Sequence, residues 1–340
     1  MKRGTILLVV ALVSLAGLLL ALPAAALFGW FFMDYSTPAN ANQKPPREEF
    51  AADRAAPAPA TPVAFDAKRA MGYLEQVCKI GPRVSGSDGM KQQQQLLKKH
   101  FEAHGAKVEL QTFTARQVSE KKPIEMANLI AVWHPDRQRR VLLCAHYDTR
   151  PIADEEPDRA KWHGRFLGAN DGGSGVALMM ELAHHLKGLQ TQAGVDFVLF
   201  DGEEYILDPK CDKYFFGSEH FAQQYRNAKH RYAGAVLLDM VAGKNASFPY
   251  ERNSAFLAGP LVEQFWNIAE ELKCGRFQKQ FGPEILDDHL ALNRAGIPAI
   301  DVIGFNYPHW HRLTDTPENC SGETLEEVAK VVSVWLQRAK

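Results

Sequence analysis

The spacing of apolar residues changes repeatedly along the chain beyond about residue 65. Helical spacing occurs over residues 66–79, 89–104, 174–186, 261–272 and 323–337. Strand-like runs, several of them wholly apolar, occur over residues 108–114, 128–133, 140–146, 196–200, 233–238 and 297–303. Continuous apolar strands that alternate with helices are typical of a mostly parallel sheet covered on both faces. We therefore expect residues 65–340 to form one α/β domain, a three-layer αβα fold with a mostly parallel mixed central sheet.

A long apolar run precedes this domain. Residues 5–33 carry no charged side chain, and Lys2 and Arg3 stand before them. This run exceeds the roughly 20 residues that a membrane-spanning helix needs, and the positive-inside rule leaves the short N-terminus in the cytoplasm. The alanines at 24–26 also offer a signal-cleavage site, so we expect residues 1–34 to be either a transmembrane anchor or a cleaved signal. The domain would then be extracytoplasmic, held at the membrane by this segment or released as a secreted or periplasmic protein.

Residues 35–64 differ in composition from both of their neighbours. They are rich in Pro, Ala, Asn and charged residues and contain few large apolar side chains. Such a segment buries too little apolar surface to offset its ordering entropy, so we expect a disordered tether. The whole chain has a formal net charge of −1 and no dense Lys/Arg block, which argues against nucleic acid as a partner.

Five cysteines are scattered along the chain without a CxxC pair: Cys78, Cys144, Cys211, Cys274 and Cys320. An odd number permits at most two disulfides in an exported protein, and the spacing does not decide which residues would pair. We expect small buried residues with at most a single bridge.

Polar residues that are able to bind a metal follow several of the apolar runs. His146 ends the run at 140–146, Glu203 and Glu204 follow the run at 196–200, and Asp239 follows the run at 233–238. Between the first two runs, Asp171 lies in a glycine-rich turn that opens a helix. In open α/β sheets ligands bind outside the carboxyl ends of the strands, so these side chains are expected to meet at one edge.

Each of these residues also has an ordinary structural explanation, such as a helix N-cap for Asp171 or a solvated loop pair for Glu203 and Glu204. So many carboxylates and imidazoles on one rim are costly to desolvate unless a cation compensates them. His, Asp and Glu without thiolate are typical of catalytic zinc. One glutamate of the pair can bind the metal while the other acts as a general base or acid. Trp310 and His311, which follow the last apolar run, add a pocket wall and a further imidazole.

At these motifs the sequence resembles the co-catalytic zinc aminopeptidase superfamily, and within it the animal-type glutaminyl cyclases, from about residue 66 to the C-terminus. The resemblance assigns the metal positions to His146, Asp171, Glu204, Asp239 and His311, and the general acid/base to Glu203. In the aminopeptidases the counterpart of Asp171 bridges two zinc ions. In the cyclases one zinc is held by the counterparts of Asp171, Glu204 and His311. We therefore expect one or two zinc ions as cofactor.

Three stretches resemble the cyclase branch: residues 237–249, Asp287-Asp288-His289 and Trp310-His311. In the cyclases the counterparts of Asp239 and Asp287 share a proton with the catalytic glutamate, which makes Glu203, Asp239 and Asp287 the expected catalytic residues. Trp310 and Tyr307 are the candidate substrate-binding residues.

Three features differ from the cyclase pattern. Residues 205–209 lack the tryptophan that the animal cyclases carry there, Val176 stands in place of a cysteine, and Asp315-Thr316 resembles the peptidase branch. The expected function is conversion of N-terminal glutamine to pyroglutamate with release of ammonia, and the substrates are peptide or protein N-termini. The alternatives are a zinc aminopeptidase, in which Glu203 would deprotonate the attacking water, and an inactive binding homologue. The presence of Glu203 together with every ligand candidate favours an enzyme.

Overall fold

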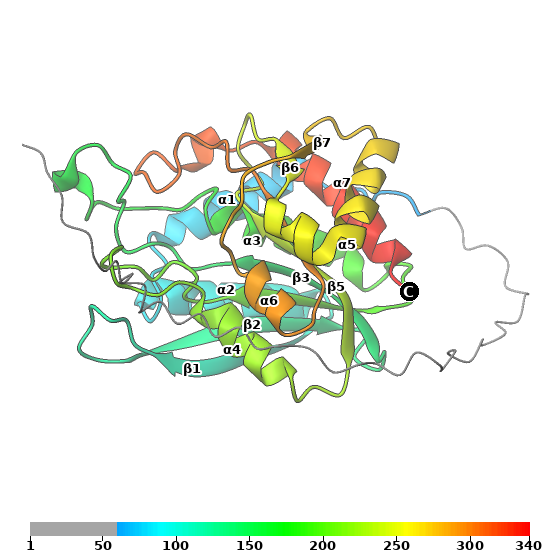
Figure 1. The fold of residues 1–340 in the computed structure, drawn as a ribbon, viewed down its shortest axis with the longest axis horizontal. Coiled ribbons are helices and arrows are strands. Elements are labelled where there is room, and N and C mark those ends of the chain that lie inside the picture. The colour runs from blue at the N-terminus through cyan, green and yellow to red at the C-terminus, as the bar shows by residue number, and fades with distance from the viewer. Residues whose placement is uncertain (1–59) are drawn as a thin grey trace, which may run out of the picture. The chain divides into compact units, whose positions relative to one another are not determined.

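The computed structural model of the protein describes residues 60–340 (Figure 1). Its helices are α1 (Ala67–Ile80), α2 (Asp88–Ala103), α3 (Gly173–Leu186), α4 (Phe216–Tyr225), α5 (Arg252–Glu271), α6 (His289–Arg294) and α7 (Gly322–Arg338). Its strands are β1 (Lys107–Ala115), β2 (Ile124–Trp133), β3 (Arg139–His146), β4 (Gly194–Phe200), β5 (Arg231–Asp239), β6 (Phe248–Tyr250), β7 (Phe277–Phe281) and β8 (Ala299–Ile303). Short 3-10 helices lie at Arg159–Lys161 and Pro317–Asn319.

The central sheet has six strands in the order β1-β2-β4-β3-β5-β8. The pairs β4–β3, β3–β5 and β5–β8 are parallel, and β1 and β2 join one edge in antiparallel pairing. Strands β6 and β7 form a separate two-stranded parallel sheet. The expected mostly parallel mixed sheet is confirmed. Because β3, β4 and β5 run in the same direction, their carboxyl ends meet at one edge, which is where the candidate site residues follow them.

Helices cover both faces of this sheet, as expected for three layers. Alternate residues of β3 divide between two apolar cores: Leu143 packs with α1, α2, α3, α5 and α7, whereas Leu142 packs with α4 and α6. Both leucines are fully buried, and burial of each such side chain stabilises the fold by about 1.5–3 kcal/mol. Burial on both faces explains why these strands are continuously apolar in sequence.

Some elements differ from the expectation. α4 and α6 were not predicted because α4 carries polar residues at most positions and α6 has only six residues. α5 begins at Arg252, nine residues earlier than the apolar period indicated. The backbone at Ala258 leaves the helical region (φ −135°, ψ 37°) just before Pro260, which lacks the N–H needed for an internal helix bond. This kink interrupts the helical spacing of apolar residues, so the sequence pattern indicates only the part of α5 that follows it.

The anchor or signal expected for residues 1–34, and residues 35–59 of the expected tether, lie outside the described residues. Residues 60–64, the end of that expected tether, contact the domain: Val63 packs on the core and its backbone N–H donates to Ser333 Oγ at 3.3 Å. Within residues 60–340 no helix combines the length and apolar character that a membrane span requires. All five cysteines lie in this range and all are free, four of them buried and Cys211 exposed.

Candidate active site and metal centre

The site lies at the carboxyl edge of the parallel strands. His146 is the last residue of β3, Glu203 and Glu204 follow β4, and Asp239 ends β5. Asp171 precedes α3 in a turn whose Gly172 has φ 78°, and a Cβ added there would lie 2.5 Å from the backbone oxygen of Asp148. Only glycine tolerates both the positive φ and this close approach, so the sequence of the turn sets the direction of Asp171.

Asp171 directs its two carboxylate oxygens to two different groups of side chains. Oδ1 lies 3.2 Å from His146 Nε2, and that nitrogen lies 3.3 Å from Asp239 Oδ1. Oδ2 lies 3.7 Å from His311 Nε2, and that nitrogen lies 3.4 Å from Glu204 Oε2. Tetrahedral zinc with bonds of 2.0–2.2 Å requires ligand atoms about 3.3–3.6 Å apart. The five expected ligands therefore converge as two sets that share Asp171.

Several polar atoms at this position are buried and have no hydrogen-bond partner among residues 60–340. They include His146 Nδ1, Asp171 Oδ2 and Glu204 Oε2. One atom each of His146, Asp171 and Glu204 lies within 4.8 Å of the others, as metal ligands would. Unpaired buried carboxylate oxygens are costly, and a divalent cation would compensate them. Nitrogen and oxygen donors without sulfur fit zinc, so the residues present suit the expected metal.

Backbone strain is concentrated next to these ligands. His311 has φ 53° and Met240, which follows Asp239, has φ 47°. Residues other than glycine adopt this left-handed region at a cost of order 1–3 kcal/mol, and such residues gather at functional sites. The surrounding fold therefore holds His311 and the end of β5 in place against their intrinsic backbone preference.

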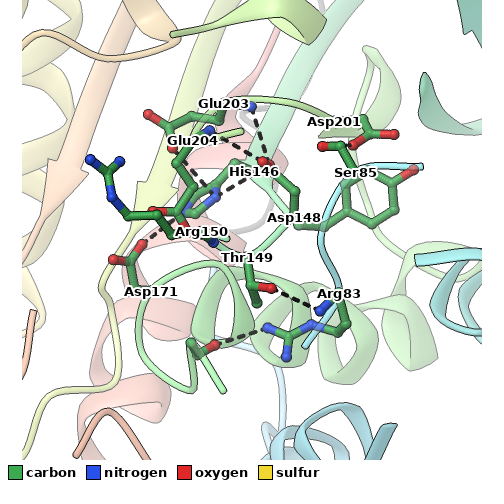
Figure 2. A network of polar contacts seen from close by, with 12 residues as sticks. Arg83, Ser85, His146, Asp148, Thr149, Arg150, Asp171, Asp201, Glu203 and Glu204 are labelled. Atoms are coloured by element: carbon green, nitrogen blue, oxygen red, sulfur yellow. Dashed lines mark hydrogen bonds and ion pairs between the residues drawn. The ribbon is translucent and has the colours of Figure 1, made fainter. Parts of the chain in front are cut away.

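A second layer of carboxylates holds the expected ligands, and sequence reasoning did not identify it. Asp148 accepts the backbone N–H groups of Glu203 and Glu204, both at 3.2 Å, as Figure 2 shows. Asp315 accepts the backbone N–H groups of Asn170 at 2.8 Å and Asp171 at 3.1 Å. Each acid thus fixes a loop that carries an expected ligand. Asp148 stands two positions after His146, so its nearness to a ligand was a signal that could have identified it.

The imidazole of His311 is oriented in the same way. Its Nδ1 lies 3.1 Å from Asp154 Oδ1, and the guanidinium of Arg150 donates to the two oxygens of Asp154 at 2.8 and 2.7 Å. The backbone N–H of Arg150 donates to Glu204 Oε1 at 2.8 Å. A carboxylate behind a histidine is the usual partner of a metal-binding imidazole. Asp154 lies in an irregular loop, so no periodicity pointed to it.

Arg83 holds the glycine-rich turn in place, and it is another residue that sequence reasoning missed. Its fully buried guanidinium donates to the backbone oxygens of Leu167 at 2.6 Å and Gly168 at 3.0 Å, and its backbone N–H donates to Thr149 Oγ1 at 2.8 Å (Figure 2). Arg83 therefore ties the turn before Asp171 to the segment that follows His146.

Further carboxylates gather beside the expected ligands. Burial raises the pKa of Glu203 well above its usual value, and the charges of Asp287 and Glu204 raise it further. Burial also raises the pKa of Asp287, followed by the charges of Asp239 and Asp288. Closely placed carboxylates disfavour one another's ionisation, and this repulsion adds to the effect of burial on their pKa values.

Asp301, on β8, extends this group and was not predicted. It is fully buried, and neither of its carboxylate oxygens has a hydrogen-bond partner within residues 60–340. Burial raises the pKa of its carboxyl group well above the usual value, with the charges of Asp287 and Asp239 next. The pairing of Asp301 with Leu237 of β5 brings it alongside the strand that ends at Asp239. It lies in the middle of an apolar strand, where the pattern of residues indicates a core position rather than a site residue.

The two candidate substrate-binding residues lie in different settings. The ring of Trp310 stacks on His311, with centroids 3.9 Å apart, and is only partly buried. Tyr307 is buried, and its hydroxyl donates to Asp315 Oδ1 at 2.8 Å. The hydroxyl of Tyr307 therefore supports the loop of Asp171, while Trp310 offers an accessible aromatic surface next to an expected ligand.

Known proteins share this arrangement of elements. The match to peptidase family M28 covers residues 128–336, more than half of the chain. A glutaminyl-peptide cyclotransferase of Boiga irregularis is 26% identical over 243 residues, which cover 62% of this chain and 64% of that protein's own length. A glutaminyl-peptide cyclotransferase-like protein of Bos taurus is 24% identical over 288 residues, which cover 75% of this chain and 71% of that protein.

Two solved structures extend the comparison. The glutaminyl cyclase of Fimbriiglobus ruber is 49% identical, with a TM-score of 0.81, and the match covers 84% of this chain and 100% of that one. A leucine aminopeptidase precursor of Bacteroides thetaiotaomicron is 30% identical, with a TM-score of 0.76, and the match covers 83% of this chain and 100% of that one. The chain belongs to peptidase family M28.

Proposed function

We propose that this protein is a zinc-dependent glutaminyl-peptide cyclotransferase that converts the N-terminal glutamine of peptides to pyroglutamate and releases ammonia. The observation that carries this proposal is the buried carboxyl group of Asp287, whose pKa is raised by burial and by the charge of Asp239 and whose charge in turn raises the pKa of Glu203. Both reactions carry a proton from the nucleophile to the leaving nitrogen, but in cyclisation the nucleophile is the α-amine itself, so the acidic group must orient that amine as well as move its proton. The 49% identity to the Fimbriiglobus ruber glutaminyl cyclase supports the same assignment.

In this proposal Glu203 moves the proton. Its side chain is 14% exposed, so it can meet a substrate, and its raised pKa suits a group that must both accept and donate near neutral pH. Asp287 and Asp239 would orient the substrate α-amine and hold the proton that is shared with Glu203. Asp301 adds a further carboxyl group next to them, and burial together with the charge of Asp287 raises its own pKa.

The metal would be held by Asp171, Glu204 and His311, the set that includes Asp171 Oδ2. Zinc bound there would supply a Lewis acid for the glutamine side-chain carbonyl. Asp154 fixes the tautomer of His311 by accepting from its Nδ1, and Arg150 keeps Asp154 ionised and in place. His146 and Asp239 form a second set around Asp171 Oδ1, so the chain carries donors for one or two ions.

An apolar rim beside the acidic group suits the entry of a peptide end. Leu286, next to Asp287, is 68% exposed, and Phe305 is 39% exposed. The ring of Phe305 lies 5.2 Å from that of Trp310, centroid to centroid. We propose that Trp310 packs on the substrate glutamine and that Leu286 and Phe305 contact the residues that follow it.

The apolar run at residues 5–33 supports export of this domain as a further proposal. The segment would act as an anchor or as a cleaved signal, with the catalytic domain outside the cytoplasm in both cases. The intact mass of protein extracted from membranes distinguishes the two, because an anchor retains Lys2 and Arg3.

The second candidate is a zinc aminopeptidase, favoured by one specific observation. Asp171 divides its oxygens between two ligand sets, an arrangement that suits two metal ions. The 30% identity to the Bacteroides thetaiotaomicron leucine aminopeptidase precursor agrees with it. In that reaction Glu203 would take the proton of the attacking water, and Asp287 would have no direct task.

One experiment separates the two reactions. Wild type, Asp287→Asn and the exposed control Glu284→Gln are incubated with a Gln-initiated and a Leu-initiated peptide, and products are read by mass. The proposal expects loss of ammonia from the Gln peptide and an intact Leu peptide. Asp287→Asn should lower this turnover by about 10²–10⁴, the range of a lost proton-transfer group, with zinc content and melting temperature unchanged. Glu284→Gln should match wild type.

The cyclase proposal fails if wild type releases leucine and forms no pyroglutamate, and the aminopeptidase then stands. The proposed role of Asp287 fails if wild type cyclises glutamine and Asp287→Asn, with normal zinc content, does so equally fast.

A further inference from the structure

Three histidines gather on the surface at the far end of α3 from Asp171. His100 lies in the last turn of α2, His104 caps the same helix, and His184 lies in the last turn of α3. One ring nitrogen from each lies within 4.8 Å of the others, and the rings are partly exposed. The ring centroids of His104 and His184 are 4.1 Å apart, and those of His100 and His104 are 4.5 Å apart. The mechanism proposed above uses none of them.

Hydrogen bonds to backbone oxygens fix the tautomers of two of these rings. His100 Nε2 lies 2.8 Å from the backbone oxygen of Met180, and His104 Nδ1 lies 2.8 Å from the backbone oxygen of His100. A carbonyl oxygen only accepts, so each of these nitrogens carries the hydrogen. The lone pairs are therefore left on His100 Nδ1 and His104 Nε2. Metal-binding histidines are usually held in this way, with the second nitrogen donating to a carbonyl or carboxylate.

The third ring has a hydrogen-bond partner on a neighbouring helix. Tyr73 Oη, on α1, lies 2.7 Å from His184 Nε2, and the two rings stack with centroids 6.1 Å apart. Three imidazoles thus lie within reach of one ion, and a phenol from α1 holds one of them. A structural role as a surface aromatic cluster would account for stacking alone, but it does not require one nitrogen of each histidine to lie within 4.8 Å of the others.

The charges around the cluster permit a cation. Burial lowers the pKa of His100 to about 4, and burial together with the charge of His104 lowers the pKa of His184, so both rings are neutral at physiological pH. Arg69, whose charge also acts on His184, is paired with the buried carboxylate of Glu181 at 2.5 and 2.6 Å. Neutral imidazoles are the form that binds transition metals.

We propose that His100, His104 and His184 form a second metal site of this protein, which takes a divalent transition metal such as zinc. Three imidazole nitrogens would hold the ion, and solvent would fill the fourth position of a tetrahedral shell. Because α3 rises about 1.5 Å per residue, this site lies about 18–20 Å from Asp171 and is separate from the catalytic centre. An ion bound there joins α2 and α3, and so stabilises the folded domain against unfolding.

The test counts zinc in a matched set of variants. Wild type, His184→Asn, His104→Asn and the control His185→Asn are equilibrated with a series of buffered Zn²⁺ concentrations, and bound zinc is measured by elemental analysis. His185 neighbours His184 on α3 but is outside the cluster. We expect wild type and His185→Asn to bind one zinc more than His184→Asn and His104→Asn, or to bind it at least about 10-fold more tightly.

Thermal unfolding gives a second readout that does not depend on activity. With chelator present, a melting temperature of His184→Asn close to that of wild type shows that the variant is folded. Added Zn²⁺ should then raise the melting temperature of wild type and His185→Asn further than that of His184→Asn. Equal zinc binding by wild type and His184→Asn at every Zn²⁺ concentration overturns the proposal. So does an equal loss in His185→Asn, which would mark a general disturbance of α3.

Discussion

The adjacent carboxylates of Glu203 and Glu204 should respond oppositely to the same substitution. Glu204 is 1% exposed, its Oε1 accepts the backbone N–H of Arg150 at 2.8 Å, and its Oε2 faces His311 Nε2 at 3.4 Å. Oε1 is therefore occupied by a backbone hydrogen bond, and Oε2 points to the expected metal position. Glu203 accepts no side-chain hydrogen bond from any residue in the range 60–340, and its Oε2 lies 3.7 Å from His146 Nδ1.

Glutamine has nearly the same shape as glutamate but loses the negative charge and one acceptor. In Glu203→Gln no hydrogen bond within the described chain is lost, so zinc content and melting temperature should stay close to those of wild type. Turnover should fall by about 10²–10⁴, which corresponds to about 2.7–5.5 kcal/mol of transition-state stabilisation. In Glu204→Gln the amide NH₂ must face either Arg150 N–H or the metal position. Both placements are unfavourable, so zinc should be lost.

The assay measures kcat on a Gln-initiated peptide and zinc by elemental analysis, for wild type and both variants purified without chelator. Adding zinc in excess should restore part of the activity of Glu204→Gln and none of that of Glu203→Gln. The reasoning is refuted if purified Glu203→Gln contains no zinc while purified Glu204→Gln retains zinc and is inactive.

Three further outcomes are expected. Asp154→Asn removes the charge behind His311 Nδ1 and should weaken zinc binding by about 10–100-fold, measured by competition with a chelator. Burial acts to raise the pKa of Glu251, but hydrogen bonds from His289 and from backbone N–H groups outweigh it and lower the pKa from 4.5 to about 2. Because the folded pKa is the lower one, this stabilisation, up to about 3 kcal/mol, is complete above pH 4.5 and is lost as pH falls toward 2. Urea unfolding of Glu251→Gln should therefore depend less steeply on pH in that window than wild type. Finally, deletion of residues 1–59 should leave the melting temperature of the domain unchanged. Deletion through Phe65 should lower the melting temperature, because Val63 and Phe65 pack on the core. Equal melting temperatures for the two deletions would contradict this role of Val63 and Phe65.

The order of elements and the expected ligands could be inferred from sequence because their signals are local. A strand buried on both faces must be apolar throughout, so the ends of β3, β4 and β5 were visible, and with them His146, Glu204 and Asp239. The glycine-rich turn before α3 is also a local signal, because the φ of 78° at Gly172 requires glycine there, and this turn pointed to the neighbouring Asp171. The apolar period failed at α5, where Pro260 interrupts the helix, and at α6, which is too short to show a period.

What only the tertiary structure decided is which polar groups share a site and how each is directed. Asp148, Asp154 and Asp315 support the expected ligands through polar contacts with residues up to 157 positions away in the chain. Asp301 becomes part of the acidic group because β8 pairs with β5, and the histidines of α2 and α3 meet because those helices pack on the same face of the sheet. Apolar burial acts on residue type and leaves a periodic trace in the sequence. A hydrogen bond or a ligand set depends on the direction of single atoms from distant segments, and that direction exists only once the sheet has formed.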